Sequence, residues 1–171
     1  MRVELAKGLW RPMTGADLQA VCAIADRVHV SYPEDDAVFA ERQRLYPAGC
    51  AVFDCEGRPA AYAVTHPWRY AEPPALNVML GEIPVRPSTY YIHDIAMAPE
   101  ARGSGAGSAI VEAVIAHAGE TGVPNLSLVA VNNSVPFWSR FGFEVVAEPA
   151  LAEKLLTYDA DARFMVRKSA A

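Results

Sequence analysis

At 171 residues the chain is long enough for one domain with a substantial core, and its 52% of apolar residues excludes a disordered protein. Acidic residues (20) outnumber basic ones (15), and the formal net charge of −5 argues against a broad nucleic-acid-binding surface. We therefore expect a single domain over residues 1–171 whose partners include no nucleic acid.

The cysteines and the apolar runs predict the environment of the protein. Three cysteines occur, Cys22, Cys50 and Cys55, and their number and spacing fit neither a disulfide framework nor a metal site. The N-terminus lacks the apolar core of a signal peptide, and no stretch approaches the ~20 apolar residues of a membrane span. The sequence predicts a cytoplasmic protein with no membrane partner and no metal.

The first half of the chain predicts short strands around two helices. Thr14 and Asp17 have the spacing of a helix capping box, and apolar residues at helical intervals follow as far as about His29. Apolar runs on both sides of a turn at 56–58 are typical of a β-hairpin. In chain order we expect a strand at 3–13, helices at 18–29 and 38–46, strands at 50–54 and 60–65, an irregular loop at 66–74 and an edge strand at 76–80.

The second half predicts strands that alternate with helices. We expect a strand from Tyr90, a helix through Ala118 that ends at Gly119 or Gly122, a strand at 125–131, a short helix to Phe141 capped by 132–134, and strands at 143–147 and 163–167. The order βααβββαβαββ indicates an α/β fold with a mixed sheet and helices on both faces.

One stretch, from Tyr90 to Gly107, joins a strand to an apolar helix through a glycine-rich turn. Backbone N–H groups at a helix N-terminus attract anions, and glycine lets a phosphate approach closely. A dinucleotide fold needs the spacing G-x-G-x-x-G and an acidic residue after the next strand, but that strand ends in V-N-N at 131–133. The remaining alternatives are a flexible helix start without a ligand and a site for another phosphate-bearing cofactor.

Two motifs favour a cofactor site. Residues 102–107, R-G-S-G-A-G, match the R/Q-x-x-G-x-G/A motif of the GNAT superfamily of N-acetyltransferases. Residues 137–143, F-W-S-R-F-G-F, resemble its second motif, in which tyrosine usually stands at the Trp138 position. The chain resembles this superfamily over most of its length, least at 66–87 and after Glu148. The resemblance implies a mostly antiparallel central sheet with helices on both faces, in which two central strands diverge.

The resemblance also implies acetyl-CoA as cosubstrate. Backbone N–H groups of the glycine turn would cradle the pyrophosphate, the preceding strand would pair with the pantetheine arm, and a backbone N–H there would polarise the thioester carbonyl. Asn133 and Ser134 stand where members often contact the cofactor, although helix capping is an alternative for both. The implied cofactor-binding residues are Ile95, Ala96, Met97, Arg102, Gly103, Ser104, Gly105, Ala106, Gly107, Asn133 and Trp138.

His93 is the first candidate for a general base. Histidine titrates near neutral pH, and in a regular strand His93 shares its side-chain direction with Ile95 and Met97. The segment Y-I-H-D-I-A-M also resembles arylalkylamine N-acetyltransferases, whose strand histidines carry protons. His93 matches one of these histidines, and Tyr91 stands at the position of the other. The alternative for His93 is a half-buried residue bonded to the backbone. In a regular strand Asp94 is expected on the opposite face as a structural hydrogen-bond acceptor, and a bulge that turns its side chain is the alternative.

The acid that protonates the departing thiolate is missing from the second motif. Many members use a tyrosine hydroxyl, whereas the indole of Trp138 can donate a hydrogen bond but cannot act as an acid. Packing in the core and contact with the pantetheine arm are the alternatives for Trp138. Ser134 and Tyr91 are the alternative proton donors.

The acceptor is predicted from two segments, 32–36 (Y-P-E-D-D) and 66–70 (H-P-W-R-Y), on the acceptor side of this fold. Carboxylates with aromatics suit a cationic amine, although acidic loops are often only solvated surface. We expect transfer of an acetyl group to a primary amine of a small molecule by direct attack in a ternary complex. The alternatives are a non-catalytic acyl-CoA-binding module, transfer to a protein amine, and transfer to a hydroxyl or of a longer acyl chain. A homodimer is a general expectation for such proteins.

Overall fold

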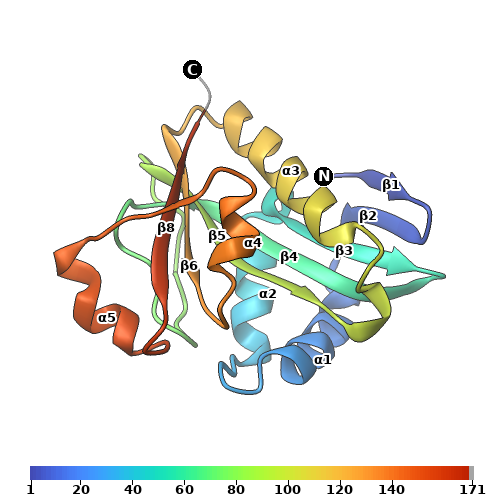
Figure 1. Cartoon of the computed structure of the whole chain (residues 1–171). Coiled ribbons are helices and arrows are strands. Elements are labelled where there is room, and N and C mark those ends of the chain that lie inside the picture. Colours follow the sequence, from blue (N-terminus) through green and yellow to red (C-terminus); the bar gives the residue numbers. More distant parts are fainter. Residues whose placement is uncertain (170–171) are drawn as a thin grey trace.

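The protein, described over residues 1–169 by a computed structural model, is built on one eight-stranded sheet (Figure 1). The strand order is β1-β2-β3-β4-β5-β6-β8-β7, and all neighbours are antiparallel except β5 and β6, which are parallel. The strands are β1 (Val3–Leu5), β2 (Gly8–Pro12), β3 (Cys50–Cys55), β4 (Arg58–Trp68), β5 (Thr89–Met97), β6 (Asn125–Ala130), β7 (Glu144–Val145) and β8 (Arg163–Lys168).

Helices cover both faces of this sheet (Figure 1). They are α1 (Leu18–Val28), α2 (Asp36–Leu45), α3 (Ala106–Glu120), α4 (Val135–Ser139) and α5 (Ala152–Leu156), of which α5 was not predicted. Apolar residues of α3, among them Ile110 and Val114, pack on one face, and those of α1 and α2, among them Ile24 and Phe39, pack on the other. The predicted fold class is therefore confirmed. No helix within residues 1–169 has the length and apolar character needed to cross a membrane.

The N-terminal segment forms two strands and not the single one expected. β1 and β2 pair as far as Leu5 opposite Gly8, so the chain turns at residues 6–7. That turn carries none of the Asn-Gly or Asp-Gly dipeptides that mark a hairpin in a sequence. The predicted capping box before α1 is confirmed, because the N–H of Thr14 donates to Oδ2 of Asp17 at 2.8 Å.

β4 continues through part of the segment that was expected to be a loop. Pro67 pairs with Tyr90 of β5, whereas the pairing of β4 with β3 reaches only to Val64 opposite Cys50. Pro67 therefore has a strand neighbour on one side only, where the missing N–H of proline is tolerated. The loop prediction is wrong for residues 66–68.

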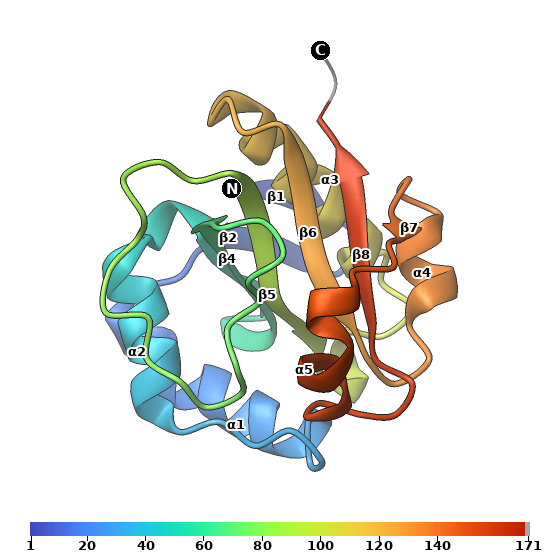
Figure 2. The same ribbon diagram turned by 90° about the vertical axis from the view of Figure 1, so that its left-hand side faces the viewer.

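The predicted edge strand at 76–80 is also wrong. This segment is a loop that runs beside α2 (Figure 2), and side chains of that helix hold it. The N–H groups of Leu80 and Gly81 donate to the carboxylate of Glu41 at 2.7 and 2.9 Å, and Arg42 donates to a carbonyl of the loop at 2.7 Å. A side-chain carboxylate thus takes the place of a neighbouring strand.

β5 and β6 pair at only two positions, Tyr90 with Leu126 and Tyr91 with Ser127. Beyond Tyr91 the two strands diverge (Figure 1), as the resemblance implied. The one parallel pair in the sheet is therefore short, and the divergence lies next to the glycine turn that follows β5.

A β-bulge interrupts β5 at His93. The register with β4 shifts at this point and leaves His93 as an extra residue. Its side chain lies on the α1–α2 face, where it bonds Glu34, whereas Ile95 and Met97 pack against the α3 cluster. Asp94 comes to the same face as His93. The expectation that His93 shares the direction of Ile95 and Met97 is wrong, because it assumed unbroken alternation.

Candidate active site

The glycine turn between β5 and α3 has a backbone conformation that side chains rarely adopt. Gly103 has a φ of +71° and Gly105 a φ of +81°. A Cβ at either position would meet no atom within 4 Å, so glycine is needed here for conformation and not for space. The hydroxyl of Ser104 braces the turn, because it donates to the carbonyl of Ala101 at 2.6 Å and accepts the N–H of Ala106 at 3.2 Å.

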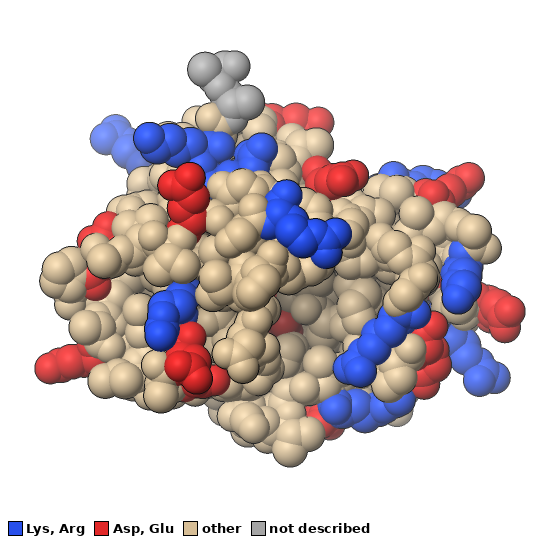
Figure 3. All heavy atoms as spheres, viewed as in Figure 1, with Lys and Arg blue, Asp and Glu red and all other residues tan. Residues whose placement is uncertain are grey.

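Several N–H groups of this turn are available to an anion. Among residues 1–169, none provides an acceptor for the N–H groups of Gly103, Gly105, Gly107 and Ser108. These groups lie at the N-terminal end of α3, where the helix dipole attracts negative charge. Acidic and basic side chains are intermixed on the face drawn in Figure 3, so backbone donors and not a broad basic patch supply the attraction there. The turn therefore has the unpaired donors that a pyrophosphate requires.

A slot of about 300 Å³ runs between the diverging strands β5 and β6. On the α3 side it is lined by Ile95, Met97, Gly107, Phe137 and Trp138, and on the α1–α2 side by His29, His93 and Asp94. The slot therefore crosses the sheet, from the glycine turn on one face to two histidines on the other. This shape suits an extended arm such as pantetheine.

Residues 102–106 of the glycine turn do not line the slot, and neither do two predicted cofactor residues outside that turn, Ala96 and Asn133. The side chain of Ala96 is buried in the α1–α2 cluster, which leaves only its backbone for a ligand. Asn133 is exposed and lines a separate hollow with Arg163, whereas Asn132 lines the slot. Ser134 also lines the slot. It is the N-cap residue of α4, but its hydroxyl makes no capping hydrogen bond.

Trp138 both packs in the core and lines the slot. It is 9% exposed, and its ring stands edge-on to Phe137 and Phe143, with 5.2 and 5.6 Å between ring centroids. One edge of the ring forms part of the slot wall. Both interpretations of this residue are compatible with its position, and neither supplies an acid.

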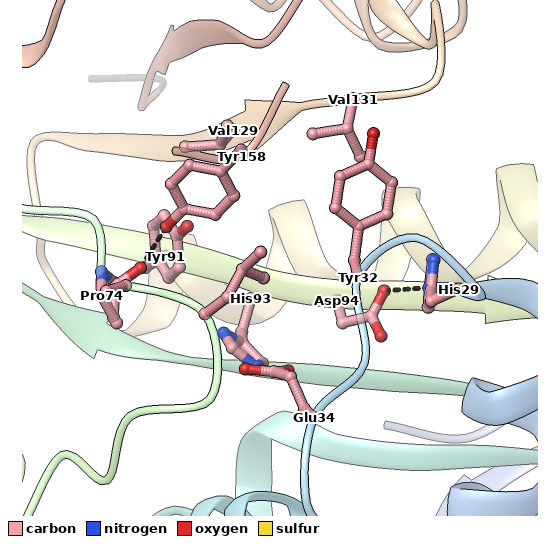
Figure 4. Close-up of a pocket in the computed structure, with 12 residues that line it drawn as sticks. His29, Tyr32, Glu34, Pro74, Tyr91, His93, Asp94, Val129, Val131 and Tyr158 are labelled. Carbon is pink, nitrogen blue, oxygen red and sulfur yellow. Dashed lines mark hydrogen bonds and ion pairs between the residues drawn. The ribbon is translucent and has the colours of Figure 1, made fainter. Parts of the chain in front are cut away.

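A smaller cavity, of about 60 Å³, adjoins the slot on the α1–α2 side (Figure 4). Its own walls come from Tyr32 and Glu34 between α1 and α2, from Tyr91 of β5, from Tyr158 and from loop residues 74–76. The residues that line both the slot and the smaller cavity are His29, His93, Asp94, Val129 and Val131. The two spaces therefore meet at three titratable side chains.

His93 is paired with a buried carboxylate. Its Nε2 lies 2.9 Å from Oε2 of Glu34, and the two side chains are 6% and 7% exposed. Burial alone would raise the pKa of Glu34, but His93, the backbone of Asn77 and the charge of Arg42 hold that pKa below its ordinary value. Glu34 is therefore an anion at neutral pH, and the shared hydrogen belongs to Nε2 of His93. The lone pair of the neutral imidazole is then on Nδ1.

His29, predicted only as the end of a helix, forms a second pair. Its Nε2 lies 2.9 Å from Oδ1 of Asp94, whose other oxygen accepts the hydroxyl of Tyr62. Burial lowers the pKa of His29, but the hydrogen bond to Asp94 and the charge of Glu34 outweigh burial, so the pKa is raised. Asp94 is the hydrogen-bond acceptor that the sequence predicted. Its partner was missed because a histidine after a helix has an ordinary explanation at a helix C-terminus.

Tyr91 lines the smaller cavity but not the slot. It is 3% exposed, and burial together with Tyr158 raises its pKa well above the ordinary value. His66 lies beside it, with 5.7 Å between ring centroids. Burial and the neighbouring His93 lower the pKa of His66 to about 3, so this imidazole is neutral.

Only part of the predicted acceptor segments reaches the cavity. Tyr32 and Glu34 line it, whereas Asp35 accepts a hydrogen bond from the side chain of Asn77 at 3.1 Å. Residues 66–70 do not line it, although His66 packs behind it against His93. The acidic loop is therefore partly a solvated surface and partly a wall of the site.

Known structures share this fold at low sequence identity. Ard1 from Thermoplasma volcanium is 19% identical with a TM-score of 0.73, over 97% of this chain and 100% of its own. The ribosomal-protein-S18-alanine N-acetyltransferase from Escherichia coli is 18% identical with a TM-score of 0.67, over 100% and 96%. A phosphinothricin acetyltransferase from Sinorhizobium meliloti, solved with AcCoA, is 20% identical with a TM-score of 0.67, over 95% and 89%.

Sequence comparison provides the family. No curated protein matches the chain in sequence. The model of the acetyltransferase (GNAT) family matches residues 17–143, which include α1, the bulged strand, the glycine turn and Trp138. Since this match extends over well more than half of the chain, the protein belongs to the GNAT acetyltransferase family.

Proposed function

We propose that the protein transfers an acetyl group from acetyl-CoA to a primary amine of a small molecule, by direct attack in a ternary complex. The observation that carries this proposal is the position of His93. It stands where the slot and the smaller cavity meet, and buried Glu34 orients its imidazole. A base is needed at such a junction because an amine is cationic at neutral pH and only the neutral amine is a nucleophile.

The glycine turn and the slot suit acetyl-CoA, which supplies an activated acyl group as a thioester when bound. The unpaired N–H groups at the start of α3 are placed for the pyrophosphate. The backbone of β5 beside Ile95 lines the slot, where it can pair with the pantetheine arm and polarise the thioester carbonyl. Nδ1 of His93 then takes a proton from the amine nitrogen as the new N–C bond forms.

The smaller cavity favours a small cationic amine. Its lining includes the carboxylates of Glu34 and Asp94 and no lysine or arginine. The rings of Tyr32, Tyr91 and Tyr158 add aromatic surface of the kind that attracts an ammonium group. The small volume and the loop that walls the cavity support a small molecule over the amine of a protein.

Two measurements test this proposal. Calorimetry with acetyl-CoA should give a dissociation constant in the micromolar to millimolar range that is usual for substrates. A screen of primary amines with acetyl-CoA, followed by the release of free thiol, should identify an acceptor, and the product mass should increase by one acetyl group. Absence of acetyl-CoA binding would overturn the proposal.

A non-catalytic acyl-CoA-binding module is the second candidate. The observation that favours it is Trp138, which leaves the slot without the hydroxyl that usually stands at this position. Such a module binds acetyl-CoA but releases no thiol with any amine in the screen. A product that carries its acetyl group on a hydroxyl, or whose mass corresponds to a longer acyl group, would redirect the proposal to another acceptor or donor.

A further inference from the structure

Departing CoA needs a proton donor in the slot. A thiol has a pKa near ~8.5, so protonation of the sulfur assists its departure at neutral pH. Within residues 1–169, the slot side chains that carry a transferable proton at neutral pH are those of Ser134, His93 and His29. The hydroxyl of Ser134 is too weak an acid, and His93 is already assigned as the base that takes protons from the amine. His29 is the remaining group.

The position of His29 places it on the path of the thioester. Its ring lines both the slot and the smaller cavity, and Asp94 holds Nε2 at 2.9 Å. Nδ1 has no hydrogen-bond partner among residues 1–169, and it is not enclosed by protein atoms. Figure 4 shows the His29–Asp94 and His93–Glu34 pairs on neighbouring walls of the same site. The site thus has two oriented imidazoles, each with one nitrogen occupied by a carboxylate.

We propose that His29 is the general acid of the transfer, and that it delivers its Nδ1 proton to the sulfur of departing CoA. This inference rests on the proposed function. When the C–S bond breaks, its electron pair moves to sulfur, which takes the proton and leaves as a thiol. His93 takes the first proton of the ammonium group and passes it to solvent, and it takes a second proton from the nitrogen as the N–C bond forms. A turnover therefore leaves His29 neutral and His93 protonated, with one proton released to solvent. Exchange with solvent restores both, and the protons balance.

The surroundings of His29 favour its protonated form. Burial opposes ionisation, but the anions of Asp94 and Glu34 raise the pKa of His29 above its ordinary value of 6.5. The protonated form, which carries the proton for the thiolate, is therefore more favoured in His29 than in a free histidine. The titratable groups that face this site are Asp94, His93 and Tyr91 of β5, Tyr62 of β4, Tyr32 and Glu34 from the segment between α1 and α2, and Tyr158.

The variant His29→Gln tests the proposal. Glutamine keeps a donor for Asp94 but cannot act as an acid, so kcat with acetyl-CoA and the best amine of the screen should fall about 10²-fold. Calorimetry should give an unchanged dissociation constant for CoA. In the unaltered protein kcat should decline at high pH as His29 loses its proton, and this basic limb should be absent in the variant.

His117→Gln is the matched control. His117 lies on α3, on the other face of the sheet, where Nε2 bonds the hydroxyl of Tyr46 at 3.1 Å. This variant should keep the kcat and the pH profile of the unaltered protein. A basic limb that persists in His29→Gln, or a loss of CoA affinity as large as the loss of kcat, would overturn the role of His29.

Asp94→Asn provides a second route to the same conclusion if His29→Gln does not fold. Removal of the carboxylate lowers the pKa of His29, so the basic limb should move to lower pH, whereas an unmoved limb contradicts the proposal. If the unaltered protein releases thiol and neither variant changes kcat or the pH profile, only the acid role is refuted. An unaltered protein that binds acetyl-CoA but releases no thiol would instead refute the proposed function, and the acid role with it.

Discussion

Glu34 and His93 are 59 residues apart in the chain, yet Oε2 of Glu34 and Nε2 of His93 lie 2.9 Å from each other. Glu34 comes from the segment between α1 and α2, and His93 reaches it because the bulge in β5 places the imidazole on that face. Both side chains are nearly buried, so water does not compete for the contact. The pair therefore fixes both the orientation and the tautomer of the imidazole.

His93→Gln should lower kcat by about 10²-fold, because glutamine fills a similar volume but cannot accept and release a proton. The dissociation constant of acetyl-CoA should change little, since the unpaired N–H groups proposed to hold the pyrophosphate lie in the glycine turn. Steady-state kinetics and calorimetry measure the two quantities separately. Equal losses in both would indicate that His93 has only a structural role.

Glu34→Gln should have a smaller effect on kcat than His93→Gln. The amide keeps a hydrogen-bond partner for the imidazole but removes the negative charge that stabilises its protonated form. We expect kcat between those of the unaltered protein and His93→Gln, with KM for the amine raised because the cavity loses one of its two carboxylates. A Glu34→Gln protein with unchanged kcat and unchanged KM would contradict this role.

Gly105→Ala should weaken acetyl-CoA binding. The φ of +81° is strained for any L side chain, at a cost of about 1–2 kcal/mol, and the relaxed turn would point its N–H groups away from the phosphates. Gly119→Ala is the matched control, because Gly119 lies within α3 and a Cβ there meets nothing within 4 Å. It should stabilise the protein by about 0.5–1 kcal/mol and leave KM unchanged. Thermal unfolding and KM for acetyl-CoA check both variants.

The glycine turn and the capping box could be predicted because their physics is local. Gly103, Gly105 and the helix that follows lie within one short segment, so their spacing alone indicates unpaired N–H groups at a helix start. Thr14 and Asp17 are likewise three residues apart. For such features the tertiary structure adds the φ angles and distances but does not alter the conclusion.

The His29–Asp94 pair could not be predicted, because it joins residues 65 positions apart, one at the end of α1 and the other within β5. The bulge at His93 could be considered from the sequence but not located, because one extra residue reverses the side-chain alternation and no residue type marks it in this strand. The position of Pro67 misled in the opposite direction. A proline argues against a strand. Here, however, β3 begins only at Cys50, opposite Val64, so β4 has no partner on that side at Pro67.

Asp17→Asn should destabilise the protein at neutral pH by about 1–2 kcal/mol. The two oxygens of Asp17 accept bonds from Arg11, both at 2.9 Å, and from the N–H of Thr14. Arg11 acts against the effect of burial and, with Thr14, lowers the pKa of Asp17 from 3.8 to about 2. A lowered pKa contributes stability that is present above pH 3.8 and is lost as the pH falls towards 2.

Urea unfolding between pH 7 and pH 2 measures this contribution. The unaltered protein and Asp17→Asn should differ most at neutral pH and approach each other below about pH 4. Asp161→Asn is the control, because Asp161 is 69% exposed and lies 3.9 Å from Arg163, so its loss should change little. A constant difference between the two proteins at every pH would attribute the effect to the cap geometry and not to the charge of Asp17.

Trp138→Tyr, made in the His29→Gln protein, should restore part of the lost kcat. A tyrosine there places a phenol hydroxyl in the slot wall, at the position of the usual proton donor of the family. Trp138→Phe in the same background is the matched control, since both substitutions leave a comparable void beside Phe137 and Phe143 but only tyrosine adds a hydroxyl. The ratio of the two kcat values isolates the effect of the proton donor. A higher kcat with tyrosine would mean that the sulfur of CoA can take its proton from either wall of the slot. Equal kcat values would mean that a hydroxyl at this position does not reach the sulfur.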